Sequence, residues 1–169
     1  VKLKKNFEKS LVEVRKNLKN KKNLFESFSK DFKLNFKLKE LDKFKKFQRI
    51  IVIGLGGSIL GAESIHHFLK SKIRKEVTFI DNLNTDLIEK VNNFKNLKKT
   101  LFILISKSGN TLELLSIVNA LKEKAKFNKD NTLVITSDKK SQINTFAKKL
   151  NIKIITHRSH IGGRYSVFS

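Results

Sequence analysis

The chain has 169 residues, of which 39% are hydrophobic, so it can bury the core of one ordinary domain and does not have the composition of a disordered tail. The formal net charge is +22, yet only five of the 37 basic residues are arginine, and a lysine excess is poor support for nucleic-acid binding because lysine lacks the bidentate fork that reads bases. The absence of cysteine excludes a disulfide scaffold, a zinc site with cysteine ligands and a cysteine nucleophile.

The sequence shows neither a membrane span nor a targeting signal. No apolar run approaches the roughly 18 residues that cross a bilayer. The lysine-rich N-terminus also lacks the apolar segment and the small-residue cleavage site of a secretory signal. We therefore expect a cytoplasmic protein. The chain begins at Val1 without an initiator methionine and stops at Ser169, directly after an apolar pair, so we expect a fragment cut at both ends.

Residues 1–49 predict a charged, helical lead-in. Apolar residues recur there every three or four positions, which is typical of an amphipathic helix: Leu3, Phe7, Leu11, Val14 and Leu18. A second, shorter stripe consists of Leu41, Phe44 and Phe47. The alternation of apolar residues over 32–38 leaves a strand and an extended linker both open.

From residue 50 onward, short apolar runs alternate with helix-length amphipathic segments, a pattern typical of βα units around a parallel sheet. The predicted strands are 50–53, 77–80, 101–105, 133–136 and 152–155. The predicted helices are 58–70, 84–94, 109–126 and 141–150, with Asn84 and Ser141 as N-caps. This favours a three-layer, flavodoxin-like α/β domain over 50–169, in which ligands bind beyond the carboxyl ends of the strands.

A glycine-rich segment, residues 54–61, follows the first predicted strand and opens a helix. Glycines remove Cβ atoms, so a ligand can approach the backbone N–H groups at the positive end of that helix. The spacing departs from the dinucleotide fingerprint, whose third glycine would fall at Ile59. Asp81, at the end of the second strand, is nevertheless placed like a ribose-binding acid. A nucleotide site and a tight turn without a ligand therefore stay open.

A polar loop, Ser106 to Thr111, follows the third predicted strand. Three hydroxyls, an ammonium group, Gly109 and a helix N-terminus form a good cage for a phosphate dianion, because they supply hydrogen bonds and a favourable dipole. It is not a Walker A loop. The alternative is that Ser108 or Asn110 only caps the helix.

A third motif, Gly162 to Ser166, follows the fifth predicted strand. A Gly-Gly turn can aim Arg164 into a cleft, where its planar donors would meet an oxyanion or a phosphate. A tight turn with a surface arginine is the alternative.

In this order and spacing, the three motifs resemble the glucose-6-phosphate isomerase (phosphoglucose isomerase) family. The likeness covers residues 50–169. The loop at 106–111 is shared by sugar isomerase (SIS) domains generally, whereas the Gly-Gly-Arg-Tyr-Ser segment looks specific to the isomerase. The resemblance implies an SIS domain preceded by N-terminal helices, and reversible conversion of glucose 6-phosphate to fructose 6-phosphate, in glycolysis and gluconeogenesis, without metal or cofactor.

The resemblance also implies roles for individual residues. Arg164 would stabilise the enediolate formed when a proton moves between C1 and C2. Asn110 stands where the family usually has threonine, which leaves the role of its side chain open. The residues assigned to binding the substrate and its phosphate are Gly56, Gly57, Ser58, Ser106, Lys107, Ser108, Thr111 and Gly163.

The family's proton-shuttling glutamate, and its histidine and lysine for ring opening, lie in later sequence that this chain lacks. We therefore expect the isolated chain to bind sugar phosphate weakly and to turn over nothing. Glu63 and Glu113 sit inside predicted helices as solvated or capping residues. The other acid, base or metal candidates are His66, His67, His157 and His160. They lack acidic partners at the spacing of metal ligands.

Two other functions compete with this one. A stand-alone SIS module that binds or senses sugar phosphates would need the loop but not Arg164. A lysine-rich binder of nucleic acid or anionic membranes would lose affinity steeply with salt. The resemblance favours sugar phosphates as ligands, no nucleic-acid or membrane partner, and a homodimer as the intact protein.

Overall fold

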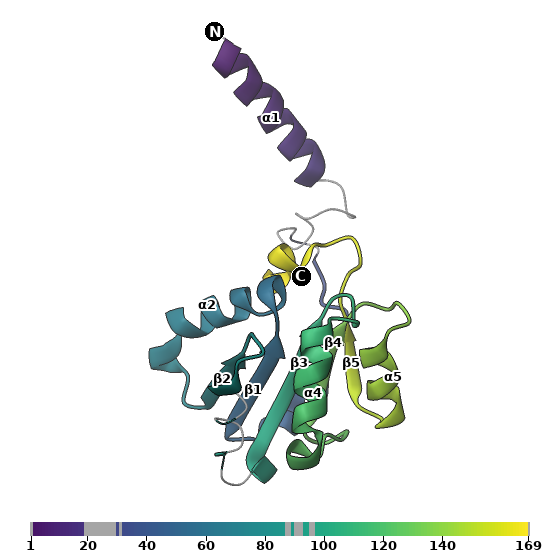
Figure 1. Cartoon of the computed structure of the whole chain (residues 1–169). Coiled ribbons are helices and arrows are strands. Elements are labelled where there is room, and N and C mark those ends of the chain that lie inside the picture. Colours follow the sequence, from purple (N-terminus) through teal and green to yellow (C-terminus); the bar gives the residue numbers. More distant parts are fainter. Residues whose placement is uncertain are drawn as a thin grey trace.

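The computed structural model describes residues 2–18, 30, 32–86, 89, 93–94 and 97–168. Its centre is a five-stranded parallel sheet with the order β2-β1-β3-β4-β5, which confirms the predicted flavodoxin-like arrangement (Figure 1). The predicted apolar runs form the strands, which are β1 (Arg49–Gly54), β2 (Glu76–Ile80), β3 (Thr100–Ser106), β4 (Thr132–Thr136) and β5 (Lys153–Thr156).

The described helices agree with the predicted ones to within a few residues at each end. They are α1 (Lys2–Leu18), α2 (Leu60–Phe68), α4 (Leu112–Ala125) and α5 (Gln142–Lys149). Short 3₁₀ helices are η2 (Leu38–Phe44), η3 (Gly56–Ser58), η4 (Lys70–Lys72), η5 (Leu97–Lys99) and η6 (Gly163–Phe168). Of the helix predicted at 84–94, residues 87–88 and 90–92 lie outside the described residues. Its predicted cap is present, since the side-chain oxygen of Asn84 accepts the N–H of Asp86 at 3.0 Å.

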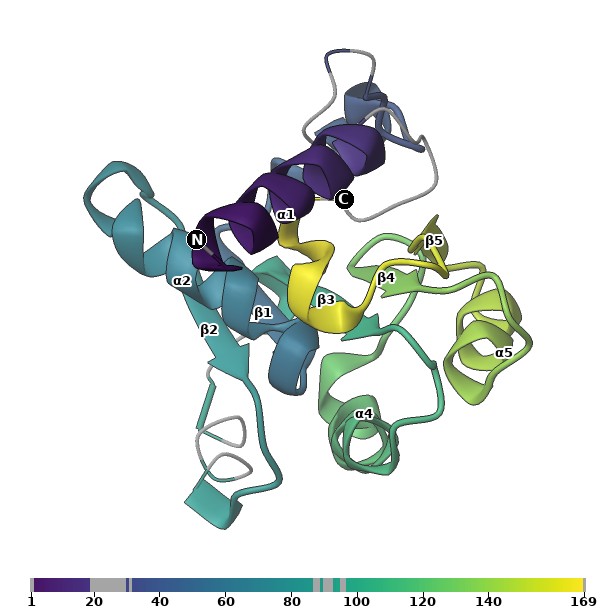
Figure 2. The ribbon, with the colours of Figure 1, turned by 90° about the horizontal axis from the view of Figure 1, so that it is seen from above.

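Two apolar clusters cover the two faces of the sheet. On one face, α4 and α5 pack on buried strand residues that include Ile53, Phe102 and Val134. On the other face, Phe44 and Phe47 pack on Leu101, Leu133 and Ile155. Figure 2 shows α4 and α5 on one side of the sheet and the segment before β1 on the other. The stripe at residues 41–47 is therefore buried against the sheet, whereas residues 32–37 are irregular and form no strand.

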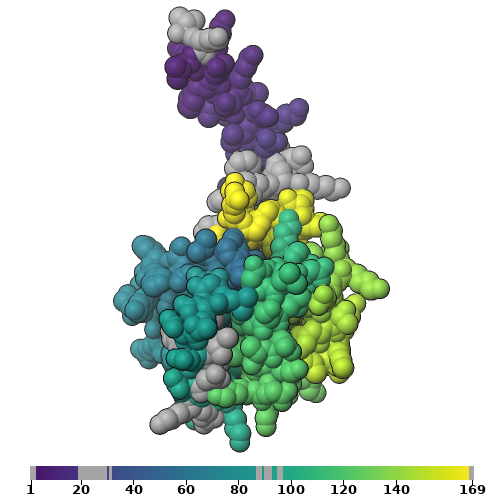
Figure 3. Space-filling view, in the orientation of Figure 1, coloured from purple at the N-terminus to yellow at the C-terminus, as the bar shows by residue number. Residues whose placement is uncertain are grey.

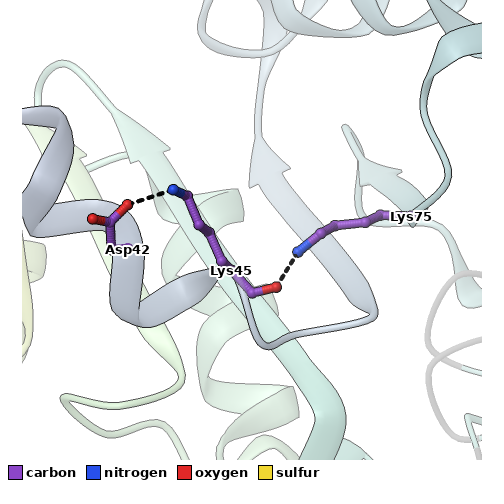
Figure 4. Close-up of polar contacts among 3 residues, drawn as sticks. All are labelled: Asp42, Lys45 and Lys75. Atoms are coloured by element: carbon purple, nitrogen blue, oxygen red, sulfur yellow. Dashed lines mark hydrogen bonds and ion pairs between the residues drawn. The ribbon is translucent and has the colours of Figure 1, made fainter.

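Polar contacts fix this segment where it enters β1. The ammonium group of Lys75 donates to the carbonyl oxygens of Lys45 and Phe47, each at 2.7 Å. The ammonium group of Lys45 lies 2.7 Å from a carboxylate oxygen of Asp42 (Figure 4). The Lys45–Asp42 pair is exposed and contributes little, so the two bonds from Lys75 do most to hold the turn beside the start of β2.

The N-terminal helix α1 is present as predicted, and its apolar stripe faces solvent. Phe7 is 63% exposed and Leu3 is 88% exposed. Figure 1 shows α1 standing apart from the sheet. The division of the chain at residue 50 stays a prediction. No helix among the described residues is long and apolar enough to cross a bilayer.

Candidate functional site

Three polar segments meet at the carboxyl edge of the sheet. They are η3 after β1, the loop 107–111 after β3, and η6 after β5. The 3₁₀ helix η6 packs against η3 and against the start of α2. Figure 3 shows the C-terminal residues that include η6, in yellow, on top of the domain. The three motifs found in the sequence are thus neighbours in space.

The loop after β3 is organised around Ser106, which is only 3% exposed. Its hydroxyl oxygen accepts the N–H of Gly109 at 3.1 Å and lies 2.9 Å from the hydroxyl of Thr111. The hydroxyl of Ser108 lies 3.3 Å from that of Thr111 and accepts the N–H of Asn110. Ser106 therefore supports the loop from below, whereas Ser108 and Thr111 stand nearer its surface.

The helix after this loop begins at Leu112 and not at the predicted residue 109. Gly109 has a φ of +67°, in the left-handed region, so the chain turns once more before α4 can start. Thr111 occupies the N-cap position, and its side chain makes no capping hydrogen bond. The side chain of Asn110 accepts the N–H of Gln142, in α5, at 2.9 Å. The alternative in which Asn110 caps the helix after the loop is therefore wrong.

A cavity of about 560 Å³ opens beside the loop. Lys107, Ser108, Asn110 and Thr111 line one side of it, and Ser58 lines another. Hydroxyls, an ammonium group and the uncapped N-terminus of α4 thus surround one space, which suits an anion. Four further lining residues were missed in the sequence: Ser137, Lys139, Lys140 and Ser159. All four follow the ends of β4 or β5, and this position is the signal that could have found them.

The glycines of the first motif make room for the third motif. A Cβ on Gly57 would lie 2.7 Å from the backbone nitrogen of Arg164, and a Cβ on Gly61 would lie 2.6 Å from the Cβ of Val167. The first motif was predicted to admit a ligand, which stays a prediction, and these two glycines also make room for the protein's own backbone and side chain. The first segment is therefore more than an isolated tight turn.

Some predicted residues stand apart from the cavity. Ser106 lies beneath the loop, and Gly56, Gly57, Gly163 and Arg164 do not line this space. The side chain of Arg164 is exposed on η6. Gly56, with a φ of +52°, serves the turn into η3.

The remaining acid, base and metal candidates are scattered. Glu113 is exposed in the first turn of α4. Glu63 lies 3.8 Å from His67, and His66 packs its ring on Phe79. Asp81 is exposed after β2. Within the described ranges, no three His, Cys, Asp or Glu residues come close enough to hold a metal ion.

His157, just after β5, lines a second cavity of about 300 Å³ that shares Ser58 with the first. Neither ring nitrogen makes a hydrogen bond of normal geometry with the described residues. Burial lowers the pKa of His157, and the nearby Lys107 ammonium lowers it further. The Arg158 backbone opposes this with a smaller effect, and His160 lowers the pKa by less still. His157 is therefore held in its neutral form.

This burial predicts a pH dependence of stability. The unfolded chain takes up a proton on His157 near pH 6.5, and the folded chain does so only at lower pH. The contribution of neutral His157 to the unfolding free energy should be fully present above pH 6.5. It should be lost as the pH drops through that value toward the lowered pKa. Thermal melts across this range should show a smaller decline for His157→Phe than for the original chain. The variant His67→Gln, which removes an exposed imidazole, is the control, and equal slopes in all three proteins would contradict the assignment.

Comparison with known proteins identifies the family. Residues 4–169 match the model of the family described as phosphoglucose isomerase. The chain belongs to this family. It is 34% identical over 133 residues to a glucose-6-phosphate isomerase of Borreliella burgdorferi, which covers 72% of this chain and 25% of that protein. It is 34% identical over 135 residues to one of Methanocaldococcus jannaschii, covering 76% of this chain and 33% of that protein.

A solved structure agrees with membership of the phosphoglucose isomerase family. The glucose-6-phosphate isomerase of Chlamydia trachomatis superposes with a TM-score of 0.62 at 27% identity. The match covers 74% of this chain and 25% of that one. The chain thus spans about a quarter to a third of the length of the relatives it matches.

Proposed function

We propose that this chain carries the phosphate-holding part of a glucose-6-phosphate isomerase, which converts glucose 6-phosphate to fructose 6-phosphate and back. The observation that carries the proposal is the cavity at the N-terminus of α4, walled by Lys107, Ser108, Thr111 and Ser58. Membership of the phosphoglucose isomerase family supplies the substrate class. We also propose that residues 50–169 form the sugar-phosphate domain and that residues 1–49 lead into it.

Each group in the loop has a separate task in holding the phosphate. The ammonium group of Lys107 neutralises charge, and the hydroxyls of Ser108 and Thr111 donate hydrogen bonds to the phosphate oxygens. The N-terminus of α4 adds a favourable dipole, which the uncapped Thr111 leaves accessible. Ser106, buried beneath, keeps the hydroxyl of Thr111 in place through their 2.9 Å contact.

Arg164 has a different task in this proposal. The turn Gly163–Arg164 rests on Gly57, which ties the arginine backbone to the same sheet edge as the loop. A guanidinium group there would stabilise the negative charge of the enediolate as the proton moves between C1 and C2. This role needs the complete site, and the substrate must bridge from the loop to η6.

The proton transfer itself needs a base. Among the described residues, the lining of the loop cavity contains no carboxylate. We therefore propose that the base comes from elsewhere in the intact enzyme, from further sequence or from the partner in a homodimer. The 169-residue chain should bind glucose 6-phosphate and leave it unconverted.

Titration of the 169-residue chain with glucose 6-phosphate tests the proposal. Lys107→Ala should weaken binding by about tenfold or more, since a hydrogen bond to a charged group contributes roughly 1.5–3 kcal/mol. The matched control is Lys46→Ala, which removes the same charge from a cavity that includes Leu97 and Lys126 and none of the loop residues. Unphosphorylated glucose should not bind measurably.

The outcomes separate this proposal from the alternatives. Equal weakening by Lys46→Ala and Lys107→Ala would mean that binding follows overall charge, as for a non-specific polyanion binder. If the intact protein did not convert glucose 6-phosphate, and Arg164→Ala left its affinity for sugar phosphate unchanged, a sugar-phosphate-binding module would be the better account. Conversion of glucose 6-phosphate by the chain alone would contradict the assignment of the base to other sequence.

A further inference from the structure

The side chain of Asn110 belongs to the loop but contacts the next helix. Its oxygen accepts the N–H of Gln142, the first residue of α5, at 2.9 Å. The two residues are 32 positions apart in the chain. Asn110 also lines the loop cavity, so it stands between the anion site and α5.

The N-terminus of α5 is capped largely by residues of this loop. The first N–H groups of any helix lack partners within the helix and need other acceptors. Here Asn110 accepts from Gln142, the carbonyl of Gly109 accepts from Ile143 at 3.0 Å, and the hydroxyl of Ser141 accepts from Asn144 at 3.4 Å. Two of these three acceptors are consecutive residues of the loop.

The other side of the loop is fixed in the same direction. The carbonyl oxygen of Lys107 accepts the N–H of Ser137 at 3.2 Å. The loop is therefore bonded both to the segment between β4 and α5 and to the first turn of α5. Gly109 lies so close to Ser141 that a Cβ would come within 2.2 Å of its hydroxyl oxygen. Among these ties, the bond from Asn110 is the one made by a loop side chain, and substitution can remove it without changing the backbone.

We propose that Asn110 is a positioning residue for phosphate binding, which holds the loop in its anion-binding shape by capping α5. The inference rests on the proposed function, because the anion is the substrate phosphate. Asn110 here does not donate to the phosphate. It fixes the backbone between Ser108 and Thr111 and so keeps their hydroxyls together; the two hydroxyl oxygens lie 3.3 Å apart. A bound anion should in turn steady the first turn of α5, because coupling between two sites is reciprocal.

The test compares two variants that each remove one acceptor from the N-terminus of α5. Asn110→Ala removes the acceptor in the loop, and Ser141→Ala removes the one outside the cavity lining. Both should lower the melting temperature by similar amounts. Inorganic phosphate and glucose 6-phosphate are titrated into the 169-residue chain well below the melting temperature. Asn110→Ala should weaken both affinities by about fivefold, the equivalent of one ordinary hydrogen bond, and Ser141→Ala should stay within about twofold of the original chain.

Hydrogen exchange provides a readout that a loss of stability alone would not move. Glucose 6-phosphate should slow exchange of the Gln142 and Ile143 amides in the original chain and in Ser141→Ala, but far less in Asn110→Ala. Equal affinities for Asn110→Ala and the original chain, or equal losses in both variants, would overturn the inference. Binding of inorganic phosphate without glucose 6-phosphate would contradict the proposed function, while the variants would still decide the role of Asn110 on phosphate. Binding of neither would overturn both.

Discussion

Replacing Gly109 with alanine should distort the loop 107–111, which is the proposed phosphate site, and lower the stability of the whole domain. A residue with a Cβ is strained at a φ of +67°, and that Cβ would lie 2.2 Å from the hydroxyl oxygen of Ser141 and 2.9 Å from a methyl carbon of Ile143. Left-handed strain and overpacking together cost about 2 to 4 kcal/mol. Chemical denaturation should show this loss of unfolding free energy, and glucose 6-phosphate binding should become undetectable.

Two further variants separate strain from the clash. Gly162→Ala is the matched control, because its Cβ would meet only the Tyr165 ring, at 3.5 Å, and its stability should be nearly unchanged. The double variant Gly109→Ala with Ser141→Gly removes the closest contacts and should recover part of the lost stability but not the strain of the backbone. A Gly109→Ala chain as stable as the original would show that the loop does not need this conformation.

Replacing Gly57 with alanine should displace η6 from the sheet edge. The new Cβ would lie 2.7 Å from the backbone nitrogen of Arg164 and 2.9 Å from the carbonyl carbon of Gly163, and backbone cannot rotate away as a flexible side chain can. Arg164 would then lose its place, so under the proposed function the intact protein should lose isomerase turnover far more than substrate affinity. The expected loss of unfolding free energy is about 1 to 3 kcal/mol.

Tyrosine fluorescence can follow this displacement directly. The chain has one tyrosine and no tryptophan, and Tyr165 lies on η6, so its emission reports on that element alone. Gly57→Ala should change both the emission and its quenching by a solute. Gly163→Ala is the control for these two signals, since its Cβ would lie 3.8 Å from Gly57, an ordinary contact. Unchanged emission in Gly57→Ala would mean that η6 does not rest on Gly57.

The sheet could be predicted because its signal is local. Each strand is a short apolar run buried by layers on both faces, and helix-length segments separate the runs, so chain order and the handedness of βα units leave few topologies. The start of α4 was misplaced for an equally physical reason. Gly109 turns left-handed where the loop packs against Ser141 and Ile143, and these residues are too far along the chain for the local sequence to reveal that packing.

The candidate site could be predicted only in part for the same reason. The loop and the two glycine motifs were visible as residue types at strand ends. The partner of Gly57 was not, because nothing near it in the sequence indicates that the backbone of Arg164 packs there. The direction of Asn110 also depends on α5, which lies far along the chain. Residue types therefore indicate the chemistry, whereas tertiary contacts decide which residues touch a ligand and which support the loop.

The pairing of the first and third motifs bears on how the chain folds. The strand β1 lies between β2 and β3, so it gains its second neighbour only after residue 106 has been synthesised. The close approach at Gly57 has to wait longer, until η6 has followed β5. Closing such long loops is entropically costly and slow. The packing of η6 on Gly57 should therefore be the last part of the domain to form, and the fluorescence of Tyr165 should distinguish the completely folded chain from a collapsed intermediate that already contains the sheet.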